Sequence, residues 1–297
     1  VDLLIEHEEQ HRETILQTLH LASPGVHVVG PPAAWAPPPS TGPLMVAVPE
    51  STIELGCATG FAYDNERPAF AVTVPAFRID RTPVTVGAYR DFLADGGYDD
   101  ERHWSAEGWA WRQQEQIARP LFWQPDGSVR RFDRFEQPRD DQPVMNVSFH
   151  EAQAFACWRG ARLPTEVEWE TAARFDPASG QTLRQPWGSA PTDRPLANVG
   201  GGALGPLPPS PNSAAPCGAL GLVGDVWEWT ASPLQPYPNF QAFPYPEYSE
   251  VFFGGPYRVL RGGSWATAEC VARSTFRNWD FPQRRQIFAG FRCAADG

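Results

Sequence analysis

The chain has 297 residues, of which 42% are hydrophobic and 12% aromatic, and its formal net charge is −11. This acidic balance argues against nucleic acid and anionic membranes as general partners. The 32 prolines and 26 glycines predict a loop-rich body. Five scattered cysteines without a Cys-x-x-Cys pair argue against a disulfide framework or a zinc ribbon. Because no apolar run is long enough to span a bilayer, we expect a cytoplasmic protein with reduced thiols.

Residues 1–21 contain neither glycine nor proline and predict one helix. Its apolar residues recur at near-helical spacing: Leu3, Leu4, Ile15, Leu16 and Leu19. We expect its acidic side chains to lie on the surface: Glu6, Glu8, Glu9 and Glu13. A lone helix cannot bury its own apolar stripe, and the chain opens on Val1, so we expect that preceding sequence is missing.

His7 and His11 lie four residues apart on this helix and therefore share one face. Two imidazoles so placed can bind one metal ion, and imidazole suits zinc, copper, iron or nickel. The spacing alone is equally compatible with a solvated helix face that carries two histidines. It also matches the zinc-peptidase motif His-Glu-x-x-His, with Glu8 as general base. The extended form of that motif needs Gly at position 14 and His at 17, where Thr14 and Gln17 stand.

After the helix, residues 23–43 are rich in proline and predict a semi-extended linker, and residues 44–297 form the body. We expect four early strands, at 45–48, 52–55, 70–74 and 76–80. We expect three helices, at 85–95, 148–159 and 165–174, the last two opening with capping boxes. Residues 98–143 are interpreted as a long irregular stretch.

Four strings in the body are too specific to be accidents of composition. They are Pro143–Ser148 (PVMNVS), Arg162–Glu170 (RLPTEVEWE), Gly224–Thr230 (GDVWEWT), and Arg261–Trp265 (RGGSW) followed by Gly290–Arg292 (GFR). Together they resemble the formylglycine-generating-enzyme-like (sulfatase-modifying-factor) domain. The resemblance implies an α+β, loop-rich, C-type-lectin-like fold over residues 44–297. Structural calcium in its loops is left open. We expect four tryptophans to serve the core: Trp169, Trp227, Trp229 and Trp265.

That domain serves more than one chemistry. Formylglycine-generating enzymes hold copper with two cysteines just after the Gly-Gly-Ser turn, whereas residues 265–273 here contain only Cys270. The ergothioneine-biosynthesis sulfoxide synthases instead join this domain to a DinB-like helical bundle that binds non-haem iron through three histidines. Two of these histidines belong to a His-x-x-x-His helix before the linker. The resemblance therefore makes residues 1–22 the last bundle helix and His7 and His11 ligands of Fe(II).

The third histidine of that family lies upstream, in a segment that this chain lacks and that we expect to be missing sequence or a separate chain. His20 lies on the same helix but far along it, and the other histidines stand in unrelated contexts: His27, His103 and His150. The same resemblance makes Gln10 a contact of the imidazole substrate. It makes Tyr245 the catalytic phenol, which carries a proton at neutral pH and would supply it, or a hydrogen atom, during oxygen activation. Tyr237 is the alternative.

Three further residues would hold the quaternary ammonium and carboxylate of a betaine: Tyr248, Asn278 and Trp279. Asp280 would bind the amine of the thiol substrate, unless it forms a salt bridge with Arg284 or Arg285. The activity implied joins a thiol, γ-glutamylcysteine or cysteine, to the imidazole C2 of Nα-trimethylhistidine (hercynine) as a sulfoxide, with O2 as oxidant. The alternatives are an ovothiol-type 5-histidylcysteine sulfoxide synthase, a formylglycine-generating-like oxidase and a non-catalytic lectin-like binding module.

Overall fold

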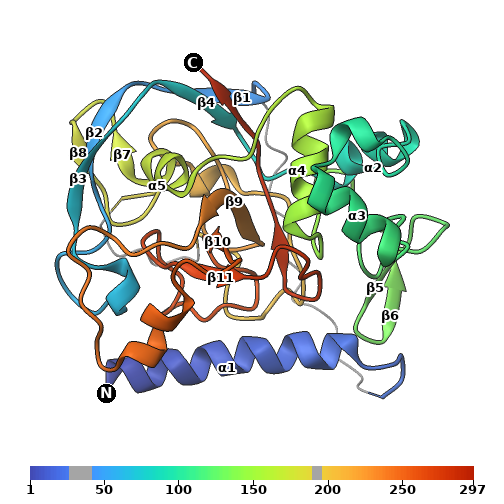
Figure 1. Cartoon of the computed structure of the whole chain (residues 1–297), viewed down its shortest axis with the longest axis horizontal. Coiled ribbons are helices and arrows are strands. Elements are labelled where there is room, and N and C mark those ends of the chain that lie inside the picture. The colour runs from blue at the N-terminus through green and yellow to red at the C-terminus, as the bar shows by residue number, and fades with distance from the viewer. Residues whose placement is uncertain (27–41, 189–195) are drawn as a thin grey trace.

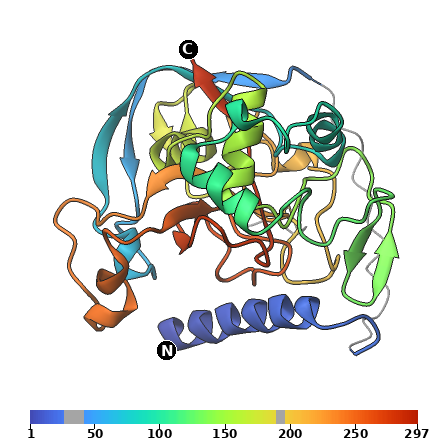
Figure 2. The ribbon, with the colours of Figure 1, turned by 45° about the vertical axis from the view of Figure 1, so that its right-hand side comes forward.

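The computed structural model describes residues 1–26, 42–188 and 196–297. Helix α1 (Asp2–Leu21) runs along one side of a body of short strands and helices, as two views agree (Figure 1, Figure 2). Within the described ranges, no helix is long and apolar enough to cross a membrane. Most of the predicted linker, residues 27–41, lies outside the described residues.

Among the described residues, the two largest sheets have four and three strands. The four-stranded sheet has the order β11 (Asn278–Asp280), β10 (Arg258–Arg261), β9 (Trp227–Pro233) and β12 (Ala289–Gly290). In it, β10 pairs antiparallel with β9 and β11, whereas β12 runs parallel to β9. The three-stranded sheet has the order β1 (Met45–Val48), β4 (Phe77–Asp80) and β13 (Ala294–Asp296). It therefore joins the start of the body to its last residues.

Three two-stranded hairpins complete the strands of the described residues. They are β2 (Ser51–Leu55) with β3 (Phe70–Val74), β5 (Val129–Arg131) with β6 (Arg134–Glu136), and β7 (Phe175–Asp176) with β8 (Gln181–Thr182). Short 3₁₀ helices occur in the connections of the body: η1 (Asp64–Glu66), η2 (Glu101–His103), η3 (Pro211–Ser213), η4 (Pro246–Tyr248) and η5 (Glu250–Phe252). The four predicted early strands are confirmed to within one residue at each end.

The three predicted helices are confirmed as α2 (Val86–Ala94), α4 (Phe149–Trp158) and α5 (Glu166–Arg174). Both predicted capping boxes form, since the Glu151 amide donates to the Ser148 hydroxyl and the Ser148 amide donates to the Glu151 carboxylate. Thr165 and Glu168 make the same reciprocal pair at the start of α5. These side chains satisfy amides that an open helix end would leave without partners.

The prediction of a long irregular stretch at 98–143 is wrong in part, because it contains α3 (Ala106–Gln114) and the β5–β6 hairpin. The Ser105 hydroxyl caps α3 by accepting from the Gly108 amide at 3.1 Å. A Cβ on Gly108 would lie 3.1 Å from His150 Nδ1, so close packing against α4 favours a glycine here. The glycine that argues against a helix in the sequence is thus explained by a tertiary contact.

The signature strings supply the core, as predicted. Trp169, Trp229 and Trp265 are 0% exposed and Trp227 is 3% exposed. The turn before Trp265 needs glycine, because Gly262 has φ +92° and a Cβ there would meet the Leu222 carbonyl oxygen at 2.5 Å. The conformation of this turn matters for the candidate site, since α1 docks against it.

Candidate metal and substrate site

Helix α1 is attached to the body largely through polar side chains. Glu6, Glu13 and His20 are 7%, 5% and 1% exposed, whereas Leu4 and Ile15 are 68% and 59% exposed. The prediction that Glu6 and Glu13 lie on the surface is therefore wrong. The three buried residues are spaced by seven, or about two turns, so they share the side of α1 that faces the body. We call Glu6, Glu13 and His20 the polar seam.

Glu13 lies at the middle of the polar seam and receives three hydrogen bonds from the body. Its carboxylate accepts from Trp227 Nε1 at 2.8 Å, Ser264 Oγ at 2.7 Å and Thr267 Oγ1 at 2.6 Å. Burial raises the pKa of Glu13, and these donors oppose that shift. One side chain thereby joins α1 to the start of β9 and to the Gly-Gly-Ser-Trp turn.

His20 ends the polar seam in an aromatic slot. Its ring centroid lies 4.1 Å from that of Phe122 and 5.0 Å from that of Phe132, and its Nε2 is 3.1 Å from the Arg130 carbonyl oxygen. Burial, followed by the nearby charges of Arg130 and Arg131, lowers the pKa of His20 to about 4. His20 is thus a neutral docking residue and is not directed toward the other two histidines of α1.

Glu6 begins the polar seam and pairs with Arg273. Arg273 Nη1 lies 2.6 Å from Glu6 Oε2, and Arg273 Nε lies 2.9 Å from Glu66 Oε2. The Arg273 guanidinium also lies over the rings of Tyr63 and Phe276, at 5.5 and 5.2 Å from their centroids. The loop after the Gly-Gly-Ser turn is therefore held between α1 and η1.

His7 and His11 turn the same ring nitrogen toward one point. Their Nε2 atoms are 2.8 Å apart and their ring centroids 4.6 Å apart. Two nitrogens bound at about 90° to one ion, at the 2.0–2.1 Å typical of zinc–imidazole bonds, would be about 3 Å apart. The pair therefore fits a metal ion in two adjacent coordination positions, and the neutral imidazole donor set suits ferrous iron.

A complete metal site is not formed within the described residues, where no group of three His, Cys, Asp or Glu side chains could hold an ion. His103 lies 3.5 Å from Asp100, and His150 packs against Trp111 at 5.4 Å between ring centroids. These contacts agree with the expectation that the two histidines serve other parts of the body; His27 lies outside the described residues. Neither iron nor calcium is assigned by the geometry alone.

Gln10 and Tyr248, predicted separately as substrate contacts, are brought together beside the histidine pair. The Tyr248 ring centroid lies 6.3 Å from that of His7. Tyr63, which the sequence analysis did not identify, lies between the two predicted contacts: Gln10 Nε2 donates to its hydroxyl, and its ring stacks on Tyr248 at 4.8 Å and 13°. Burial raises the pKa of Tyr63 to about 12 and that of Tyr248 well above its usual range. Both phenols therefore keep their protons at neutral pH.

The predicted catalytic tyrosine lies at the edge of this group. Tyr245 is 45% exposed, and its ring meets that of Tyr248 edge-on at 6.3 Å. The alternative, Tyr237, is buried elsewhere, with its hydroxyl 3.4 Å from Glu166 and Arg277 stacked 4.1 Å above its ring. Because it is packed into this charged network, Tyr237 is the less suitable of the two to act beside the histidine pair.

Asn278, Trp279 and Asp280 form strand β11. The Trp279 ring contacts Phe252 of η5 at 5.4 Å, and the Asn278 Oδ1 accepts from the Trp279 amide at 2.9 Å. Asp280 forms the alternative salt bridge that the sequence suggested, 3.1 Å from Arg284 Nε, and burial raises its pKa. The structure thus brings Gln10 and Tyr248 together with His7. It places the three residues of β11 on a strand beside η5.

Comparison with known proteins identifies the family. Residues 33–297 match the sulfatase-modifying factor enzyme 1-like domain. Over 304 aligned residues the chain is 50% identical to the hercynine oxygenase of Mycolicibacterium thermoresistibile, covering 99% of this chain and 68% of that relative. The chain belongs to the hercynine oxygenase family. It is also 49% identical to the hercynine oxygenase of Mycobacterium tuberculosis, covering 99% of this chain and 71% of that relative.

Family membership makes the chain an enzyme of the oxygenase type. The solved structure of PvdO from Pseudomonas aeruginosa shares the fold of the body, with a TM-score of 0.56, 21% identity, and coverage of 85% of this chain and 94% of that chain. This likeness confirms the predicted α+β fold of the body, and the family match assigns it to the sulfatase-modifying-factor type. The DinB-like origin of α1 stays a prediction.

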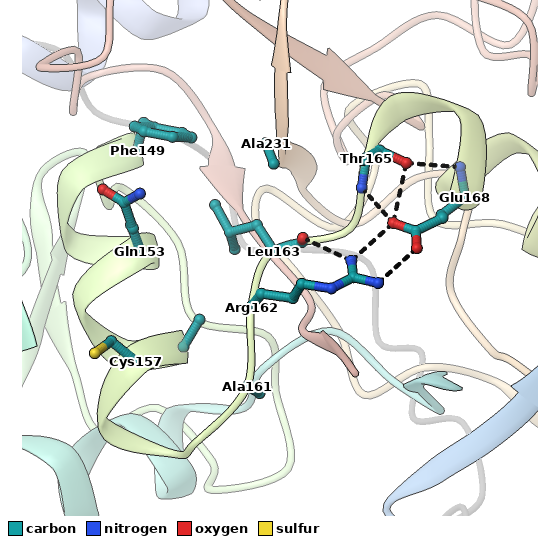
Figure 3. Close-up of a pocket in the computed structure, with 10 residues that line it drawn as sticks. Phe149, Gln153, Cys157, Ala161, Arg162, Leu163, Thr165, Glu168 and Ala231 are labelled. Carbon is teal, nitrogen blue, oxygen red and sulfur yellow. Dashed lines mark hydrogen bonds and ion pairs between the residues drawn. The ribbon is translucent and has the colours of Figure 1, made fainter. Parts of the chain in front are cut away.

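This family member also contains a cavity of about 420 Å³ between α4 and the segment that leads into α5 (Figure 3). Phe149, Gln153 and Cys157 line it from α4, and the ion pair between Arg162 and Glu168 lines the other side. None of the predicted site residues lines this cavity. The five cysteines form no disulfide in the part of the chain that is described, and Cys270 is the exposed thiol between residues 265 and 273.

Proposed function

We propose that this protein is an iron(II)- and O2-dependent sulfoxide synthase of ergothioneine biosynthesis. It joins the sulfur of a small thiol to the imidazole C2 of hercynine. The thiol S–H and the imidazole C2–H each lose hydrogen, one oxygen atom of O2 becomes the sulfoxide oxygen, and the other leaves as water. Four electrons pass from the two organic substrates to O2, so no further reductant is needed.

One observation carries this proposal: the two Nε2 atoms of His7 and His11 converge at 2.8 Å beside Gln10 and Tyr248. Over 99% of its own length, this chain is 50% identical to a hercynine oxygenase. The histidine pair supplies neutral nitrogen ligands, and the neighbouring amide and phenols supply the polar groups that an imidazole substrate needs.

Bound ferrous iron would supply the redox chemistry and leave open positions for substrates. The chain's own residues would orient those substrates. Gln10 hydrogen-bonds the imidazole, and the Tyr248 and Trp279 rings contact the quaternary ammonium through their faces. Asn278 donates an amide N–H to the carboxylate, Asp280 holds the amine of the thiol, and Tyr245 supplies the proton or hydrogen atom.

We further propose that a third histidine comes from outside this chain. The chain spans 68% and 71% of the lengths of the two relatives. Leu4, Ile5 and Ile15 are more than half exposed on α1, which would suit packing against further helices. The expected partner is an upstream DinB-like bundle, within the same polypeptide or as a separate chain.

The test is mass spectrometry after aerobic incubation with Fe(II), hercynine and a mixture of cysteine, γ-glutamylcysteine and glutathione. The chain is assayed alone and with its upstream segment restored. A sulfoxide adduct in the restored protein is expected, and its mass names the thiol. His7→Ala and His11→Ala should each lose bound iron, and stoichiometric iron in both variants would refute the ligand assignment.

The alternatives give different outcomes in the same experiment. An ovothiol-type enzyme would take plain histidine and remove the imidazole C5 proton rather than the C2 proton, which proton NMR of the product distinguishes. A binding module would bind hercynine without consuming O2. A formylglycine-generating-like oxidase would instead oxidise a cysteine of a peptide substrate, which the single Cys270 does not favour.

A further inference from the structure

Tyr63 occupies a central position in the candidate site although it lies far in sequence from the other residues. It is 2% exposed and directly precedes η1. Its backbone amide donates to Glu66 Oε1 at 3.0 Å, and its ring meets the Phe276 ring edge-on at 5.5 Å. The ring is therefore held by Phe276 and by the stacked Tyr248, while the hydrogen bond to Glu66 fixes the backbone that carries it.

The Tyr63 hydroxyl connects two predicted substrate contacts. It accepts a hydrogen bond from Gln10 Nε2, and the ring that carries it stacks on the Tyr248 ring at 4.8 Å. A carboxamide is planar, with its nitrogen and oxygen on one carbon, so holding the nitrogen against Tyr63 also determines where the oxygen lies. Without the Tyr63 hydroxyl, Gln10 Nε2 keeps a long contact of 3.5 Å with the Glu6 carbonyl oxygen. That contact restrains the amide less, so its N–H₂ group can turn toward the substrate instead.

We propose that Tyr63 is a positioning residue that holds Gln10 with its carboxamide oxygen toward the substrate and Tyr248 with its ring face toward the same space. In this arrangement the oxygen accepts an N–H from a neutral imidazole, and a substrate without an N–H donor there is disfavoured. This inference rests on the proposed function and adds the residue that orients its substrate-binding groups. Tyr63 acts through Gln10 and Tyr248.

The test is Tyr63→Phe in the iron-loaded full-length protein, with hercynine as the varied substrate. The ring and its stacking are retained, and only the hydroxyl is removed. We expect the KM and the equilibrium Kd for hercynine to rise about tenfold, as loss of an oriented hydrogen bond predicts. The kcat should stay within about twofold and the iron content should not change, because the metal ligands are untouched.

The matched control is Tyr89→Phe. Tyr89 is also a fully buried tyrosine in a stacked pair, and its hydroxyl lies 2.9 Å from that of Tyr98, within the core. It should lose a similar amount of stability without a change in the KM for hercynine. Tyr63→His, which keeps a hydrogen-bonding ring, should recover part of the lost affinity if it folds, and it provides a second variant should Tyr63→Phe accumulate poorly.

A double-mutant cycle separates a positioning role from a general loss of structure. If Tyr63 acts through Gln10, Tyr63→Phe should add little to the KM increase that Gln10→Ala causes alone. Additive effects, or an unchanged KM in Tyr63→Phe, would overturn the inference while the unsubstituted enzyme still converts hercynine. Absence of hercynine binding and turnover in the unsubstituted protein would instead refute the proposed function.

Discussion

Replacing Glu13 by alanine should weaken the docking of α1 on the body. The carboxylate is 5% exposed and accepts from three donors that are themselves almost fully buried, those of Trp227, Ser264 and Thr267. Alanine removes the acceptor of all three donors at once. The loss should therefore exceed that of an ordinary surface glutamate.

The expected magnitude follows from the donors. The two hydroxyls can rotate, and Ser264 and Thr267 already lie 3.4 Å apart, so they recover part of their hydrogen bonding with each other. The Trp227 N–H is fixed by its ring and cannot. One buried donor without a partner costs about 1–3 kcal/mol. With the lost packing and the weakened hydroxyl contacts, α1 docking should weaken by about 3 kcal/mol in total.

Amide hydrogen exchange over α1, read by mass spectrometry, measures this directly. A 3 kcal/mol loss corresponds to about a hundredfold lower protection, at 1.36 kcal/mol per factor of ten. Glu8→Ala is the matched control, because Glu8 lies on the exposed side of the same helix and its removal should change protection little. Equal protection of α1 in the two variants would refute the reasoning that the polar seam holds the helix.

Acidification should destabilise the folded protein through His20. The pKa of His20 is about 4 in the folded state, below its usual value of 6.5. The unfolded state therefore binds one more proton than the folded state as the pH falls from 6.5 to 4. The free energy of unfolding should drop by up to about 3 kcal/mol over that window, and a His20→Gln variant whose urea unfolding shows the same pH dependence would contradict this. Tyr245→Phe should suppress sulfoxide coupling and divert O2 to thiol oxidation, as measured by product ratios; unchanged coupling there, with loss in Tyr248→Phe, would move the role to Tyr248. Asp280→Asn should mainly raise the KM for the thiol, whereas an effect limited to thermal stability would mean that Asp280 serves only its salt bridge with Arg284.

Local sequence signals were sufficient to predict much of the secondary structure of the body. The capping boxes at Ser148 and Thr165 predicted helix starts because their hydrogen bonds involve neighbours three residues away. Helix α3 was missed because Gly108 lowers helix propensity, and the reason for that glycine is a contact with His150, far along the chain. Ser105, followed by a run of residues without proline, was the available signal.

The polar seam could not be predicted from composition, since acidic residues on a helix usually face solvent. The partners of Glu13 lie more than 200 residues away in the chain, and no residue near Glu13 in the sequence indicates which they are. The seven-residue spacing of Glu6, Glu13 and His20 was visible, but without the partners it does not distinguish a buried seam from a solvated one. Tyr63 was missed for the same reason: its importance arises from tertiary contacts with Gln10 and Tyr248.

The contacts of Glu6 and Gln10 belong to one continuous chain of interactions, here called the circuit, that begins and ends on α1. Glu6 binds Arg273, Arg273 binds Glu66, Glu66 accepts from the Tyr63 amide, and the Tyr63 hydroxyl accepts from Gln10, one turn along the helix from Glu6. A slip of α1 by one residue would shift it by about 1.5 Å and turn it by about 100°, breaking the circuit at both Glu6 and Gln10. His7 lies between these two anchors. The position of the histidine pair relative to Tyr63 and Tyr248 is therefore determined by the body as much as by the helix that carries it.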